Sequence, residues 1–166
     1  MFYTGKMKTI NIYPKNKEHY VKLLKFGKEI QQICRKSGTE PVTYGGLIYF
    51  GYTRDKNARV HDIDFLVPEK CLEKIAEKLK AKRINYRWNH KWHDFKIYKN
   101  GTKVELDSIE TYHGKGKIEN FDFNGLKVKA VSLDSLTNTY KDACRESHGK
   151  HKQHVRRYET LKKLKR

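Results

Sequence analysis

The residues most suited to chemistry are two aspartates, Asp62 and Asp64, which are separated by one apolar residue. They lie in the segment Val60–Val67, whose alternation is typical of a β-strand. Alternate residues of a strand point to the same face, so the two carboxylates lie side by side, roughly 7 Å apart at the backbone. Paired carboxylates in an apolar setting repel each other without a cation, and Mg²⁺ prefers oxygen ligands. The pattern predicts a magnesium site, although exposed acids on an amphipathic strand have the same spacing.

Two further features accompany this pair. Gly45 and Gly46 lie upstream between two apolar runs, and glycine lets a backbone approach a triphosphate and offer its N–H groups. Downstream, Glu105 and Asp107 alternate in a second strand-like segment, 103–109, and either can supply a third carboxylate. A glycine pair alone can be a simple turn, and acids on a strand can be solvated. Together the features favour a two-ion magnesium site, which activates an attacking hydroxyl and stabilises a leaving pyrophosphate.

The order of these motifs resembles that of the nucleotidyltransferase (DNA polymerase β-like) superfamily, in particular its minimal and antibiotic-type members. The resemblance covers residues 41–161. The family's helix–Gly-Gly–strand segment matches residues 43–46, and its D-x-D motif matches residues 62–64. Its third carboxylate matches Glu105 best and Asp107 second. The resemblance implies a magnesium-dependent enzyme that transfers an NMP from an NTP to an acceptor hydroxyl.

The resemblance also implies a role for each candidate residue. The magnesium ligands and catalytic residues would be Asp62 and Asp64, with Glu105 or Asp107 completing one site and helping to deprotonate the acceptor. The nucleotide-binding residues would be Gly45, Gly46, Arg59 and Lys141. Arg59 lies one residue from the position at which many relatives carry an arginine, and Lys141 lies in a late helix that carries a lysine in family members.

The elements that must position these residues indicate an α/β (α+β) fold, a mixed β-sheet with flanking helices. We expect residues 1–166 to form a single nucleotidyltransferase-like domain, with a core at about 41–161 and an N-terminal strand and helix within 7–38. Helical spacing predicts helices over 16–36, 68–81, 134–146 (capped by Ser132 or Asp134) and 151–164. Alternation and two Asn-Gly turns predict strands at 7–13, 60–67, 84–88, 92–98, 103–109, 118–123 and 126–131.

The charge of the chain indicates a polyanionic partner. Lys and Arg number 37 against 19 acids, a formal net charge of +18. A field of this sign attracts nucleic acids and nucleotides. A lysine-rich or thermophile protein surface can carry many basic residues for other reasons. Here, however, the number of acidic residues is not raised along with the number of basic ones, which favours a polyanionic partner. RNA, such as a tRNA end, is therefore the favoured acceptor, while a small molecule or a partner protein stays open. The alternative function is a non-catalytic nucleic-acid-binding module that retains the fold.

Several classes of protein are disfavoured by the composition. No apolar run approaches the roughly 18 residues that a membrane span needs. The N-terminal residues lack the apolar block and cleavage site of a signal peptide, so we expect a cytoplasmic protein with no membrane partner. Cys34, Cys71 and Cys144 form no C-x-x-C pair, which argues against a zinc knuckle or a disulfide framework.

Overall fold

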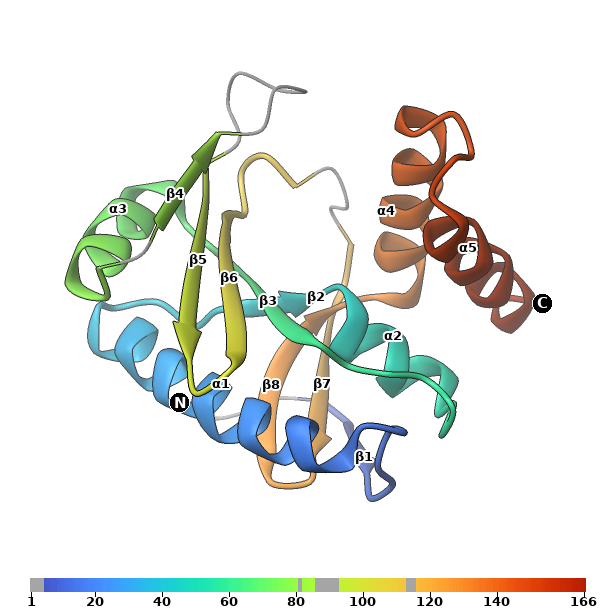
Figure 1. The fold of residues 1–166 in the computed structure, drawn as a ribbon, viewed down its shortest axis with the longest axis horizontal. Coiled ribbons are helices and arrows are strands. Elements are labelled where there is room, and N and C mark those ends of the chain that lie inside the picture. Colours follow the sequence, from blue (N-terminus) through green and yellow to red (C-terminus); the bar gives the residue numbers. More distant parts are fainter. Residues whose placement is uncertain (1–4, 81, 86–92, 113–115) are drawn as a thin grey trace.

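The computed structural model describes residues 5–80, 82–85, 93–112 and 116–166. Within these residues the chain forms one eight-stranded sheet with five helices (Figure 1). The elements are β1 (Met7–Ile10), α1 (Lys17–Lys36), β2 (Val42–Tyr44), α2 (Gly46–Thr53), β3 (Asp62–Val67), α3 (Glu69–Lys78), β4 (Lys82–Asn85), β5 (His93–Lys99), β6 (Thr102–Ser108), β7 (Ile118–Phe123), β8 (Leu126–Val131), α4 (Leu133–Glu146) and α5 (Lys152–Leu164).

The sheet is mixed, which confirms the predicted fold class. Its strand order is β1-β7-β8-β2-β3-β6-β5-β4. Three pairs run parallel, namely β1 with β7, β2 with β8 and β3 with β6, and the remaining neighbours are antiparallel. The two predicted Asn-Gly hairpins form, joining β5 to β6 and β7 to β8. Of the strand predicted at 84–88, residues 86–88 lie outside the described residues.

The packing of α1 fixes the orientation of β3. The backbone of Gly27 lies so close to this strand that a Cβ there would meet Ile63 Cδ1 at 2.4 Å. Neighbouring residues of a strand point to opposite faces, so α1 covers the face of β3 that carries Ile63. Asp62 and Asp64 are therefore directed away from α1. The close approach that glycine allows seats the helix directly on the strand that carries the two aspartates.

The segment after the glycine pair corrects one expectation. Residues 46–53 form the helix α2, so the order is strand–Gly-Gly–helix, and the predicted order of helix–Gly-Gly–strand is wrong. Leu47, Ile48 and Phe50 are fully buried in this helix. Because α2 is enclosed on nearly all sides, it lacks the polar face whose spacing marks a helix in a sequence.

The two last helices pack against each other beside the sheet (Figure 1). Of the two predicted caps, Ser132 caps α4, because its hydroxyl accepts a hydrogen bond from the backbone N–H of Ser135 at 3.2 Å. The second helix, α5, also contacts α2, so it closes over the start of that helix. None of the described helices is both long and apolar enough to cross a membrane. All three cysteines have free thiols.

Candidate active site

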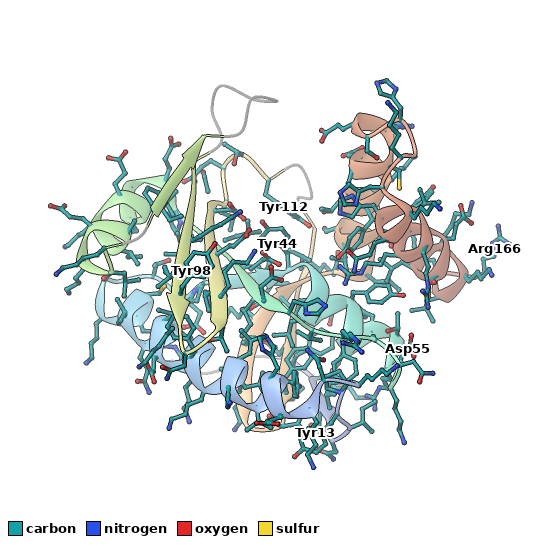
Figure 2. The ribbon with its side chains drawn as sticks, in the orientation of Figure 1. Tyr13, Tyr44, Asp55, Tyr98, Tyr112 and Arg166 are labelled. Atoms are coloured by element: carbon teal, nitrogen blue, oxygen red, sulfur yellow. The ribbon has the colours of Figure 1, made fainter. Side chains whose placement is uncertain are left out.

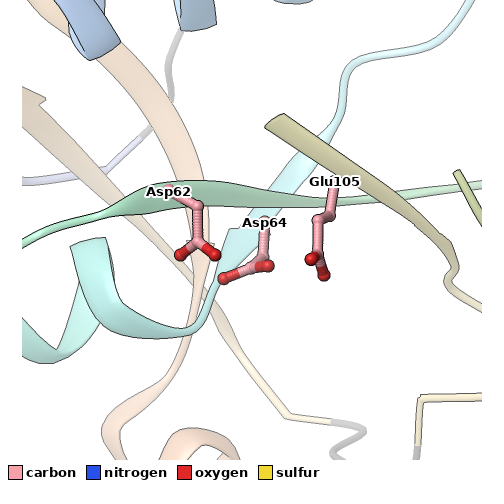
Figure 3. Close-up of side chains that lie close together, drawn as sticks. All are labelled: Asp62, Asp64 and Glu105. Atoms are coloured by element: carbon pink, nitrogen blue, oxygen red, sulfur yellow. The ribbon is translucent and has the colours of Figure 1, made fainter. Parts of the chain in front are cut away.

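Three carboxylates from two neighbouring strands converge. Asp62 and Asp64 come from β3 and Glu105 from β6, and one oxygen of each lies within 4.8 Å of the others. The parallel pairing places Asp64 directly opposite Glu105, and Figure 3 shows the three side chains pointing to the same side of the strands. A compact set of carboxylate oxygens is the donor chemistry that Mg²⁺ prefers. The residues present therefore fit a divalent cation.

The electrostatics of the cluster also favour a cation. Desolvation and the neighbouring carboxylates of Asp62 and Glu105 raise the pKa of Asp64 well above its ordinary value. The Lys103 ammonium lies 3.0 Å from Asp62 Oδ2 and 2.8 Å from Glu105 Oε1. Burial alone would lower the pKa of Lys103, but its hydrogen bonds to these two carboxylates outweigh burial and raise it. The cluster thus already attracts positive charge from within the chain.

The other candidate for the third carboxylate, Asp107, lies apart from this cluster. Its side chain is buried and accepts a hydrogen bond from the Tyr44 hydroxyl, and the Tyr44 ring in turn packs on Tyr112 with ring centroids 5.3 Å apart (Figure 2). Burial raises the pKa of Asp107 to about 7, although the Tyr44 hydrogen bond acts to lower it. Of the two residues, the structure brings Glu105 to Asp62 and Asp64.

Replacing Asp107 by Asn tests whether this residue is a buried, protonated carboxyl, through the pH dependence of stability. The folded carboxyl holds its proton to about pH 7, while the unfolded one loses it near its ordinary pKa of 3.8. Folding therefore binds a proton, and wild-type stability falls as pH rises through this window. Relative to wild type, Asp107→Asn should gain about 2–4 kcal/mol between pH 4 and pH 8, measured by urea unfolding with EDTA. The exposed Asp134→Asn is the control, and parallel profiles for wild type and Asp107→Asn would contradict the assignment.

The glycine pair adjoins the carboxylates. Gly45 has φ +77°, and a Cβ on it would meet Asp64 Oδ2 at 2.1 Å, so only glycine leaves room for this carboxylate. Gly46 begins α2, where free backbone N–H groups attract anions. A Cβ on Gly46 would lie 3.5 Å from the Arg157 guanidinium, an ordinary contact. The chain thus places the start of a helix, whose backbone N–H groups can attract an anion, beside the three carboxylates.

The two glycines and the two aspartates line one pocket of about 320 Å³ between the sheet and the two last helices, and Glu105 is not among its lining residues. Its walls are formed by β2, the start of α2, β3, α4 and α5, through Tyr44, Gly45, Gly46, His61, Asp62, Asp64, Thr139, Tyr140, Ala143, Gln153, His154 and Arg157. A second pocket of about 200 Å³ adjoins it and shares three of its lining residues, His61, Gln153 and Arg157. Arg59 and Arg156 line this second pocket, which is accordingly basic.

Arg157 was not predicted as a site residue from the sequence. Its guanidinium lies over the rings of Tyr49 and Tyr140, 5.1 and 5.6 Å from their centroids, and it donates a 2.8 Å hydrogen bond to the Tyr140 hydroxyl. These contacts fix a permanent positive charge beside Gly46. Lys141, the lysine expected in this role, is not among the described residues that line either pocket. The adjacent residue, Tyr140, takes the pocket-facing position.

Comparison with known proteins identifies the fold. A scan of protein-family models and a search of curated proteins found no match. Among solved structures, a proposed nucleotidyltransferase of Thermotoga maritima is 18% identical, with a TM-score of 0.58 over 86% of this chain and 92% of that one. The antibiotic-resistance factor ANT(2'')-Ia, in complex with adenylyl-2''-tobramycin, is 14% identical, with a TM-score of 0.61 over 86% and 92%. An antigenic nucleotidyltransferase-like protein of Paracoccidioides brasiliensis is 13% identical, with a TM-score of 0.54 over 84% and 74%. The chain has the nucleotidyltransferase fold, as the motifs predicted.

Proposed function

We propose that this protein is a magnesium-dependent nucleotidyltransferase that transfers an NMP from an NTP to an acceptor hydroxyl. The observation that carries the proposal is the convergence of Asp62, Asp64 and Glu105, with Gly45 and Gly46 beside them at the edge of one pocket. Nucleotidyl transfer needs bound cations next to a phosphate-binding backbone. Asp62 and Asp64, which would hold the cations, line the same pocket as Gly45 and Gly46, which would bind the phosphates.

The carboxylates have distinct roles in the proposed reaction. Asp62 and Asp64 would hold the magnesium, and Glu105 would complete one site. The bound metal supplies Lewis-acid charge that favours an ionised acceptor oxygen and neutralises the departing pyrophosphate. A bond forms between the acceptor oxygen and the α-phosphorus while the bond to pyrophosphate breaks. The acceptor proton passes to Glu105 or to water.

The phosphates would lie toward α2 and α5. Backbone N–H groups at Gly45 and Gly46 would bind the β- and γ-phosphates, with the Arg157 guanidinium opposite them. Arg59 lies in the adjoining basic pocket, where it would contact the distal end of the triphosphate. We assign the charge next to the leaving group to Arg157 rather than to Lys141.

The acceptor that fits the surrounding charge is RNA. Asp62 and Asp64 are the only acids among the described residues that line the pocket. The adjoining helix α5 carries five Lys or Arg residues and one acid, and Arg166 follows at its end (Figure 2). A cationic acceptor such as the tobramycin that is adenylylated in the complex of ANT(2'')-Ia would be repelled by this helix. A nucleic acid instead gains affinity that falls with salt.

The test is transfer of label from each α-³²P NTP in turn, with magnesium and total RNA or lysate. We expect label in an RNA species with one preferred NTP, dependent on magnesium and absent without the protein. Sequencing the labelled species would identify the acceptor. Salt-sensitive RNA binding without magnesium-dependent NTP binding would instead establish the non-catalytic binding module, and label in a small molecule or a protein would replace RNA as the acceptor.

A further inference from the structure

The cluster of carboxylates contains a cation of its own. Lys103 belongs to β6, two residues before Glu105 and therefore on the same face. The pairing of the strands sets it directly opposite Asp62 on β3. Its ammonium bridges Asp62 and Glu105 at 3.0 and 2.8 Å. The register of the two strands thus sets Lys103 beside both acids, and its side chain places the amino group between them.

The position of this ammonium is one that a divalent ion would use. A cation shared by Asp62 and Glu105 needs an oxygen from each within about 2–2.5 Å, and both oxygens are already turned toward Lys103 Nζ. An ammonium and a metal ion cannot share this space. Asp64 is not an ion-pair partner of Lys103 among the described contacts. The ammonium therefore does not occupy the position between Asp62 and Asp64.

A second lysine adds to the positive charge at the same end of the cluster. Lys96 on β5 is paired in register with Glu105, and its amino group lies 3.6 Å from Glu105 Oε1. Glu105 therefore has two lysine partners and Asp62 has one, whereas Asp64 has no ion-pair partner among the described residues. This asymmetry distinguishes two cation positions that the carboxylates alone would make similar.

We propose that Lys103 is a built-in counter-cation that occupies the Asp62–Glu105 position and competes there with a divalent ion. The inference rests on the proposed function only in taking the cluster to be a metal site. The position at Asp62 and Asp64 binds a divalent ion first. The position at Glu105 fills only when a divalent ion, brought in with the nucleotide or at high concentration, displaces the ammonium.

The test is Mn²⁺ binding to the nucleotide-free protein, followed by calorimetry and by the electron paramagnetic resonance signal of free Mn²⁺. At sub-millimolar Mn²⁺ we expect one ion per wild-type chain. Lys103→Met should bind a second ion, or bind Mn²⁺ about tenfold more tightly or better, because a neighbouring positive charge has been removed. With EDTA the same variant should melt at a lower temperature than wild type, and Mn²⁺ should reverse the loss.

Three further variants keep the result decisive. Lys99→Met removes one charge from an exposed ion pair with Glu29, 2.6 Å away, and controls for the general field of the protein. Lys103→Arg keeps the charge and should bind Mn²⁺ within about threefold of wild type. Lys103→Gln is measured in parallel, so that a folding defect of the Met variant does not end the experiment.

The outcomes separate this inference from the proposed function. Equal Mn²⁺ stoichiometry and affinity in wild type, Lys103→Met and Lys103→Gln would overturn the role of Lys103, whatever the labelling assay shows. Tighter or additional binding in both uncharged variants, but not in Lys99→Met, would support it even if no NMP transfer were found. Binding of no Mn²⁺ by any of the proteins would overturn it together with the metal site.

Discussion

Asp64→Asn is expected to lower the rate of NMP transfer about a thousandfold or more, while the protein stays folded. Asp64 lies between the other two acids of the cluster (Figure 3), lines the pocket and adjoins Gly45. Loss of this ligand removes charge stabilisation of the transition state that a metal provides, which is worth several kcal/mol. The amide keeps the size of the side chain, so the contacts with neighbouring residues persist.

The same variant should be at least as stable as wild type when no divalent ion is present. In the wild type, desolvation and the charges of Asp62 and Glu105 act against an ionised Asp64, as the direction of its pKa shift indicates. An Asn side chain removes this repulsion. Activity and stability should therefore move in opposite directions, which distinguishes the loss of a metal ligand from simple unfolding.

Label transfer, Mn²⁺ binding and thermal unfolding with and without Mn²⁺ together check the expectation. Mn²⁺ should raise the melting temperature of wild type and not that of Asp64→Asn. Asp134→Asn, which removes an exposed carboxylate outside the pocket that pairs with Lys165, should transfer label, bind Mn²⁺ and gain thermal stability from Mn²⁺ as wild type does. Retention of full transfer and full Mn²⁺ binding by Asp64→Asn would refute the assignment of the metal ligands.

Gly45→Ala is the second change with a large expected effect. The residue has φ +77°, which costs a non-glycine residue of order 1–3 kcal/mol. The added Cβ would also overlap Asp64 Oδ2, at 2.1 Å, and would force this carboxylate away from its partners. We expect a loss of about 2–4 kcal/mol in the free energy of unfolding and about tenfold or more in Mn²⁺ affinity.

The neighbouring glycine supplies the matched control. Gly46→Ala has no positive φ to adopt and makes only an ordinary 3.5 Å contact with Arg157, so unfolding should change by less than about 0.5 kcal/mol. A double-mutant cycle isolates the overlap with Asp64. In an Asp64→Ala background, Gly45→Ala should cost only the backbone strain, and a cost equal to that in wild type would show that the carboxylate plays no part.

Much of the fold could be predicted because its elements are locally consistent. The amphipathic helix α1 has a clear apolar stripe, and the strands β7 and β8 flank a strong Asn-Gly turn, so their predicted bounds agree closely with the structure. The helix α2 could not be recognised in this way. Its apolar residues face protein on nearly every side, and a short apolar run carries no period that separates helix from strand.

Strand geometry alone predicts which carboxylates of the site share a face. Alternation placed Glu105 and Asp107 on one face of the same strand, but it could not decide between them. The decision depends on Tyr44, distant in sequence, whose hydroxyl holds Asp107. The nucleotide-side cation depends likewise on helix packing. Successive helical residues point about 100° apart, so only the packing of α4 decides that Tyr140 and not Lys141 faces the pocket. The packing of α5 likewise places Arg157 at the pocket.

The parallel register of β3 with β6 also bears on how the chain folds. Asp64 and Glu105 meet only through this pairing, and the whole of α3, β4 and β5 lies between them in the chain. Loop closure of that length must precede the three-carboxylate cluster, so an unfolded or half-synthesised chain does not bring Glu105 to the two aspartates. A divalent ion that binds all three carboxylates would therefore arrive after the topology is complete, and it would slow unfolding rather than speed folding.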